Sequence, residues 1–190
     1  PMEEFFAERE FEKQDFVKNP LPKGEYESCV FSKCVFTNQH LSNYIFSDCE
    51  FVECDFSNVK LGNTALRNVG FTNCKVQGVD FSHCNSFLLE LRFSGCQLNF
   101  SSFFKLKLKA ISFKNCSMQE VDFSDAELVS ANFDTCDLSR AIFENTNLQK
   151  ADFRSANNFN INPENNQMAG AKFSFEGLPG LLAKHKIVVK

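Results

Sequence analysis

The sequence predicts an all-β fold in which the chain coils through short straight sides, with a turn after each side. Three observations predict it: apolar residues recur at every fifth position, charged residues avoid two positions in five, and one aromatic residue dominates. Phe supplies 24 of the 190 residues, whereas Trp is absent and Tyr occurs twice. A period of five fits neither the 3.6-residue helix nor the two-residue strand. It indicates one small structural unit repeated along the chain.

The apolar period runs in two phases, and we call its central position i. Every fifth residue is apolar from Tyr26 to Phe81, and again from Leu88 to Phe153 in a frame shifted by two residues. Small or medium residues, mainly Cys, Val and Ala, fill positions i−2. Between residues 26 and 153, none of the 26 charged side chains occupies i or i−2. Two positions in five therefore face a dry interior, and three face water.

The nine cysteines follow the same frame. Eight of them occupy i−2, and Cys84 keeps the first phase. Zinc sites need close pairs of ligands, which this spacing does not offer, and disulfide frameworks belong to exported domains. A free cysteine behaves as a small, readily buried hydrophobe. We therefore expect nine thiols that fill the core, with no metal and no cofactor.

The repeat is clearest at Val121-Asp122-Phe123, Ala131-Asn132-Phe133 and Ala151-Asp152-Phe153. It resembles the pentapeptide-repeat family, and the resemblance covers nearly the whole chain. It implies a right-handed quadrilateral β-helix whose coils contain 20 residues, so that residues 20 apart lie in one column. The second run alternates Phe with Leu or Met, which places Phe columns on two opposite sides, at 93, 113, 133 and 153 and at 103, 123 and 143. The cysteines form the columns 34, 54 and 74 and 96, 116 and 136.

Departures from the period divide the chain into three parts. Residues 1–25 are expected to form an N-terminal cap coil, because a solenoid leaves open ends that need covering. The β-helix then spans 26–175, with a phase slip at 82–87 and an asparagine-rich loop thrown out at 157–167. Residues 176–190 predict a short C-terminal helix and a β tail that cap the end and form a homodimer. The dimer contacts are assigned to Leu178, Leu181, Leu182, Ile187, Val188 and Val189.

Several functional classes are excluded at this stage. The sequence contains no nucleophile elbow, phosphate loop, Rossmann glycine pattern or HExxH motif, so we expect no enzyme. Charges interrupt every window of about 20 residues, which argues against a membrane span. The acidic start PMEEFFAERE lacks the regions of a signal peptide, which predicts a cytoplasmic protein. Nearly all Phe are expected to point inward, which leaves no aromatic for base stacking, so direct nucleic-acid binding is not expected.

Function is therefore expected on the exterior, where charge is unevenly distributed. Residues 118–153 carry a net charge of −6, residues 60–114 carry +6, and a further acidic cluster precedes them. Such a patterned field steers a charged partner. The candidate partner-binding residues are the acids Asp48, Glu50, Glu53, Asp55, Asp122, Asp125, Glu127, Asp134 and Asp137.

Within the family, the chain resembles the Qnr quinolone-resistance proteins and the microcin immunity protein. Its length, its Cys- and Phe-rich repeats and its ending, from residues 160–164 through 187–189, carry this resemblance. The resemblance implies a DNA-mimicking dimer that binds DNA gyrase or topoisomerase IV and protects it from fluoroquinolones or a topoisomerase-poisoning toxin. The alternative is a structural scaffold whose flat sides bind an unknown cytoplasmic protein, with no role at topoisomerase.

Overall fold

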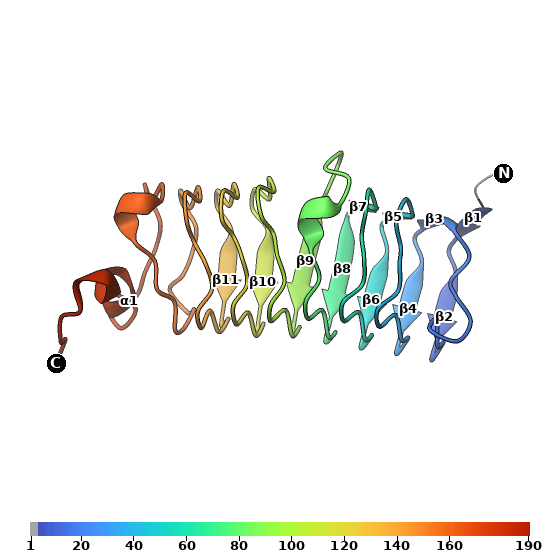
Figure 1. The fold of residues 1–190 in the computed structure, drawn as a ribbon, viewed down its shortest axis with the longest axis horizontal. Helices are drawn as coiled ribbons and strands as arrows, with labels where there is room; N and C mark the ends of the chain where they lie inside the picture. The colour runs from blue at the N-terminus through green and yellow to red at the C-terminus, as the bar shows by residue number, and fades with distance from the viewer. Residues whose placement is uncertain (1–3) are drawn as a thin grey trace.

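The computed structural model describes residues 4–190 and confirms the β-solenoid. The coils stack into a rod with the N-terminus at one end and the C-terminus at the other (Figure 1). One parallel sheet contains β1 (Glu4–Ala7), β3 (Gly24–Glu27), β5 (Ile45–Ser47) and β7 (Ala65–Arg67). The other runs in the order β11 (Asn132–Asp134), β10 (Ser112–Lys114), β9 (Leu91–Ser94), β8 (Val69–Thr72), β6 (Glu50–Val52), β4 (Val30–Ser32) and β2 (Glu10–Glu12).

The rod has four sides. Side 1 carries the sheet from β1 to β7 and continues through the bridges Lys107–Glu127 and Glu127–Asn147. Side 2 carries the longer sheet. Isolated parallel bridges build the other two, through residues 15, 35, 55, 75, 97, 117 and 137 on side 3 and through 40, 60, 80, 102, 122 and 142 on side 4. Partners are 20 residues apart, except for a spacing of 22 across the phase slip.

Residues with positive φ mark most corners. The position is i+2 of the repeat, and Asn occupies it repeatedly, as at Asn58 (φ 56°), Asn63 (φ 53°) and Asn68 (φ 54°). Asn and Gly tolerate this left-handed conformation better than other residues do. Asn side chains also bond from one coil to the next, since Asn63 Nδ2 donates to Asn43 Oδ1 at 2.9 Å. The corner residues therefore favour the turn that separates two sides.

The interior consists of the i and i−2 positions, as the charge pattern predicted. Phe93, Phe113, Phe133 and Phe153 on side 2 face Phe103, Phe123 and Phe143 on side 4, which confirms the two opposite Phe columns. Rings stack along a column, with 5.3 Å between the centroids of Phe103 and Phe123. They meet edge to face across the axis, with 5.9 Å between Phe113 and Phe123. Both geometries are favourable for aromatic pairs.

All nine cysteines are buried free thiols, as expected. The two expected columns join into one, because the two extra residues of the phase slip bring Cys96 next to Cys74. The backbone N–H of Cys54 donates to Cys74 Sγ at 3.3 Å, and the Cys74 thiol donates to the Phe51 carbonyl at 3.2 Å. Burial raises the pKa of the Cys84 thiol to about 12, so this group stays protonated at neutral pH.

The insertion lies slightly later than the predicted 82–87. Phe81–His83 form a 3₁₀ turn, and Asn85 still pairs with Ala65 at the 20-residue spacing. The 22-residue spacing begins at Leu91, which pairs with Val69. The extra residues therefore lie within 86–90, in the green loop that projects from the rod in Figure 1. The apolar period misplaced the slip because Leu88 continues the second phase in sequence but is 63% exposed.

The C-terminal region differs from the expectation in two ways. Residues 157–167 are not thrown out, because Asn157 and Gln167 keep their bridges to Asp137 and Asn147, and Phe159 and Ile161 are buried. A 3₁₀ turn, Pro163–Asn165, completes that coil. The expected helix is present as α1 (Pro179–Leu182) and the 3₁₀ turn Ala183–His185. The tail 187–189 forms no strand, since no strand edge of residues 4–190 pairs with it.

The predicted N-terminal cap, 1–25, forms a paired coil where it is described. Residues 1–3 lie outside the described residues. Strands β1 and β2 pair with β3 and β4, while Phe16 and Leu21 are buried. Nowhere in residues 4–190 is there a helix with the length and hydropathy needed to span a membrane.

Candidate interaction surface

The first group of predicted acids lies at one level of the rod, along two of its four sides. Asp48 lies at the corner between sides 1 and 2, Glu50 lies on β6, Glu53 occupies the next corner, and Asp55 lies on side 3. We call these four residues the first acidic band. The repeat explains the arrangement, because outward positions two or three residues apart fall on successive faces of a coil. The band therefore presents negative charge in several directions and not on one flat side.

Cations from neighbouring coils partly neutralise the first acidic band. Glu50 pairs with Arg92, two coils away, and Lys33 Nζ lies 3.8 Å from Glu53 Oε2. Burial opposes ionisation of Asp55, but hydrogen bonds from Ser57 outweigh it and hold its pKa below the usual range. Asp55 is therefore ionised at neutral pH, and ion pairs compensate part of the charge of the band.

The remaining predicted acids form a second acidic band, at Asp122, Asp125, Glu127, Asp134 and Asp137. They lie in order on side 4, on the following corner and on sides 1, 2 and 3. The sheet order places four strand steps between β6 and β11. At about 4.8 Å for each step, the two bands are about 19 Å apart. The structure therefore gathers the nine predicted residues into two bands.

Hydrogen bonds hold the carboxylates of the second acidic band. Bonds from Ser139 and Asn158 lower the pKa of Asp137, with donor distances of 2.6 Å and 2.9 Å to its Oδ1. Asn145 Nδ2 donates to Asp125 at 2.6 Å. Lys107 Nζ lies 3.6 Å from Glu127 Oε1. Fixed carboxylates of this kind present a charge pattern that does not need to reorganise on binding.

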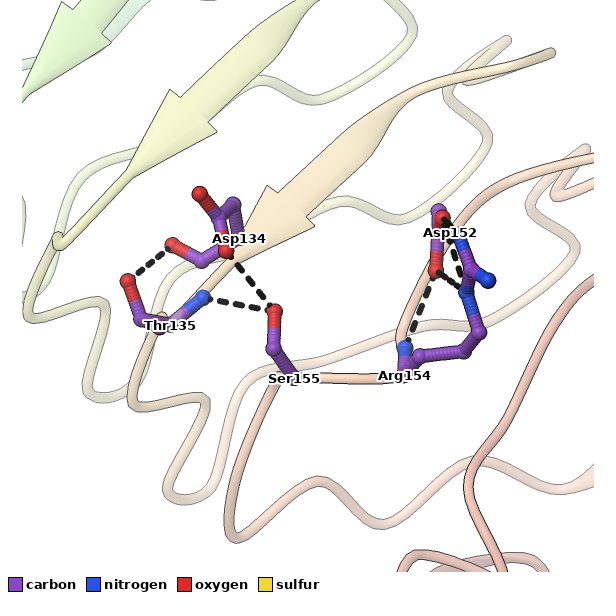
Figure 2. A network of polar contacts seen from close by, with 5 residues as sticks. All are labelled: Asp134, Thr135, Asp152, Arg154 and Ser155. Carbon is purple, nitrogen blue, oxygen red and sulfur yellow. Dashed lines mark hydrogen bonds and ion pairs between the residues drawn. The ribbon is translucent and has the colours of Figure 1, made fainter.

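Figure 2 shows the part of the second acidic band that lies on side 2, at Asp134. Ser155 Oγ donates to Asp134 Oδ1 at 2.9 Å and accepts the Thr135 N–H at 3.0 Å. Beside it, Arg154 forms a bidentate pair with Asp152, with Nε–Oδ1 at 3.0 Å and Nη2–Oδ2 at 2.7 Å. The pair holds the pKa of Asp152 below its usual range. Asp152, which is not among the nine candidates, is therefore compensated by a cation, whereas no cation within residues 4–190 forms an ion pair with Asp134.

Basic side chains lie between the two acidic bands. Arg67, Lys107 and Lys109 lie on side 1, and Arg92 and Lys114 lie on side 2. Together they form the basic band, which has no counterpart among the predicted site residues. The sequence showed the excess of positive charge over 60–114, but the side on which it gathers depends on the exact place of the insertion.

Most of the residues assigned to dimerisation are exposed at the C-terminal end. Exposure ranges from 38% for Leu182 to 80% for Val188, and Leu178, Ile187 and Val189 lie between these values. Leu181 differs, because it packs against the core of its own chain. Phe175, three residues before Leu178, is 88% exposed and was missed. It lies two residues after Phe173, at a corner position of the five-residue frame. Corner positions face outward, so the frame could have identified Phe175 as exposed.

The expectation that no aromatic is displayed is wrong for four of the 24 Phe. Phe5, Phe87, Phe100 and Phe175 are each more than half exposed. Phe100 has φ 63° and occupies a corner, where the frame itself places an outward residue. Phe87 lies at the tip of the projecting loop. These rings are local apolar contact points on an otherwise polar exterior.

Comparisons with known proteins agree with this architecture. Residues 25–103 match a pentapeptide repeat region, and residues 107–145 and 116–155 match pentapeptide repeats. No curated protein matches the sequence.

Solved structures share the fold at low identity. A trypsin-treated variant of QnrB1, a plasmid-mediated fluoroquinolone resistance protein, superposes with a TM-score of 0.77 at 17% identity, over 98% of this chain and 92% of its own. A second trypsin-treated variant of QnrB1 gives a TM-score of 0.63 at 15% identity, over 99% of this chain and 98% of its own. HetL is a pentapeptide repeat protein involved in heterocyst differentiation regulation in the cyanobacterium Nostoc. Its TM-score is 0.34 at 15% identity, over 91% of this chain and 87% of its own.

Proposed function

We propose that this chain, which belongs to the pentapeptide-repeat family, is a non-enzymatic binding protein that mimics DNA and protects a type II topoisomerase such as DNA gyrase. The observation that carries the proposal is the pair of acidic bands on a rigid rod. Hydrogen bonds fix carboxylates of the second acidic band, which has members on all four sides of the rod, as phosphates surround a duplex. The backbone likeness to QnrB1, itself a fluoroquinolone resistance protein, supports the same direction.

The mechanism follows from charge and shape. The cationic surface that binds DNA on a topoisomerase attracts an acidic rod over a distance of several ångströms, limited by screening. Bound there, the rod would compete with DNA or eject a fluoroquinolone or toxin from the complex. No step requires a covalent change in this chain, because binding alone displaces the poison.

We also propose that the rod works as a homodimer joined at its C-terminal ends. Phe175, Leu178, Leu182 and the tail 187–189 form an apolar surface that is exposed in the single chain. A second copy bound through a two-fold axis would cover it with the same residues. The dimer would double the length of the acidic rod, with one pair of acidic bands on each half.

The experiment that tests the proposal is gyrase supercoiling in the presence of a fluoroquinolone, with this protein titrated in. Rescue of supercoiling supports protection, and no rescue with a folded dimer refutes it. The triple variant Asp122→Asn, Asp125→Asn, Asp137→Asn removes three charges but keeps oxygen acceptors for the local hydrogen bonds. It should lose most of the rescue. Glu8→Gln, Glu10→Gln, Glu12→Gln removes the same charge from the exposed first coil and should retain it.

The basic band favours one second candidate, a scaffold that binds a protein partner and has no role at topoisomerase. A plain DNA mimic needs no cations between its acids, whereas a protein-binding surface uses both signs. The supercoiling experiment separates the two, since a scaffold would leave both the enzyme and its poisoning unchanged.

A further inference from the structure

The ladder of side 1 is interrupted beside the projecting loop. Ala65 pairs with Asn85, and the next bridge on this side joins Lys107 to Glu127, so no bridge connects Asn85 to Lys107. Residues 86–90 leave the side at this gap and rise above it (Figure 1). A hollow of about 820 Å³ lies there, between the loop, β7 and the segment 107–112. We call it the side-1 groove.

Four cations line the side-1 groove, against two acids. The cations are Arg67, Arg92, Lys107 and Lys109, and the acids are Asp48 and Glu90. Arg92 is held by Glu50, and Lys107 lies near Glu127. Lys109 is exposed and has no carboxylate partner within 4 Å among residues 4–190. The four cations are therefore matched in number by acids, but Arg67 and Lys109 form no ion pair within residues 4–190.

Arg67 provides a separate indication that a ligand is missing. Its Nε is buried and has no hydrogen-bond partner within residues 4–190. Its guanidinium carbon lies 5.9 Å from the centroid of the Phe87 ring, on the loop that covers the groove. A buried N–H without a partner is costly. An acceptor that enters the groove beneath Phe87 would satisfy it.

The other lining residues are mainly apolar. Leu88, Leu89, Leu91, Leu108, Ala110 and Ile111 line the groove between the cations. Leu88 and the neighbouring Phe87 are 63% and 65% exposed at its rim. Lys107 and Lys109 flank the inward Leu108, so both project outward from the same side. The exposed apolar surface beside these two lysines therefore comes from the loop, at Leu88.

We propose that the side-1 groove binds an extended acidic peptide segment of a partner protein, in which carboxylates alternate with apolar side chains. The carboxylates would accept from Arg67 Nε and from the ammonium groups of Lys107 and Lys109. The apolar side chains would cover the leucines and Phe87. A phosphodiester backbone would satisfy the cations but leave the apolar rim in water. This site goes beyond the proposed function, because that function depends on the acidic bands and this one on the cations between them.

The test uses a fluorescein-labelled peptide of eight residues in which Glu alternates with Leu, measured by fluorescence anisotropy. Lys109→Glu reverses one exposed charge in the groove and should weaken binding about tenfold, which is about 1.4 kcal/mol. Lys75→Glu makes the same change on side 3, away from the groove, and should stay within about twofold. Arg67→Met should also weaken binding about tenfold, because it keeps most of the side-chain length but has no N–H donor. Melting curves check that each variant is folded.

Four outcomes would overturn the proposal. The first is that the peptide does not bind. The second is that Lys109→Glu and Lys75→Glu weaken peptide binding equally, which would indicate attraction to net charge alone. In the third, an octamer of thymidine binds more tightly than the peptide and is weakened by Lys109→Glu, which would assign the groove to nucleic acid. A peptide with Gln in place of Glu should fail to bind, and its equal binding would also contradict the role of the cations.

Discussion

The interior columns predict a large and specific cost for Phe123→Ala. Phe123 is fully buried and its ring meets four others. It stacks between Phe103 at 5.3 Å and Phe143 at 5.1 Å, and it meets Phe113 and Phe133 edge to face at 5.9 Å and 5.7 Å. Removing a buried Phe side chain costs about 3–5 kcal/mol. Because four aromatic pairs are lost together, we expect about 4–5 kcal/mol.

A loss of that size is a large part of the stability of an ordinary domain, which is about 5–15 kcal/mol. Urea unfolding followed by circular dichroism should show it, since about 4 kcal/mol at a slope of about 2 kcal/mol per molar shifts the midpoint by about 2 M. Phe100→Ala is the matched control. It removes the same side chain from a corner where it is 58% exposed, and we expect less than about 0.5 kcal/mol.

Either of two results would refute the inward frame. Phe123→Ala could unfold at the wild-type midpoint, or Phe100→Ala could cost as much as Phe123→Ala. The stronger change Phe123→Asp should prevent folding altogether, because it buries a carboxylate without a partner.

Three further outcomes are expected. Removing residues 178–190 should give monomers or aggregates in light scattering, and an intact dimer would reject the C-terminal assembly. Gly180→Ala should loosen α1, since the added Cβ would lie 2.5 Å from the Phe159 carbonyl oxygen. The Ile161 amide, which donates to the Gly180 carbonyl, should then exchange its hydrogen faster, and an unchanged exchange rate would contradict the close packing. Because Arg154 lowers the pKa of Asp152, this pair stabilises the fold above the ordinary pKa of the carboxyl, and the contribution is lost as the pH falls through the lowered value. Arg154→Gln should raise the Asp152 pKa in an NMR titration, and an unshifted value would count against the pair.

The sequence predicted those parts of the fold that the five-residue frame determines. Phe113 and Phe123 could be placed on opposite sides, and the cysteines in the core, because inward positions exclude charge over the whole body. The frame fails where the chain leaves the coil. Leu88 continues the apolar pattern yet projects from the rod, because burial there depends on the path of residues 86–90 and not on spacing.

The candidate surface was predicted less well, for a related reason. The acids could be identified as outward, but their grouping into two bands depends on which side each coil presents. The side-1 groove could not be predicted, because Arg67, Arg92 and Lys109 meet only when the two extra residues are placed between Asn85 and Leu91. The tail 187–189 was predicted as β from its residue types, but a strand also needs a partner edge.

Because the spacing between coils is a constant 20 residues, each coil adds the same length to the rod. Deleting residues 112–131 would bring Phe133 to the position of Phe113, against Phe93, with every column preserved. Asp134 and Asp137, the members of the second acidic band that remain, would shift toward the first acidic band by one strand spacing, about 4.8 Å. Deleting ten residues would instead rotate everything that follows by half a turn, and each charge would face the opposite direction. The number of coils therefore sets the spacing of the charged bands, and the residue count modulo 20 sets their direction.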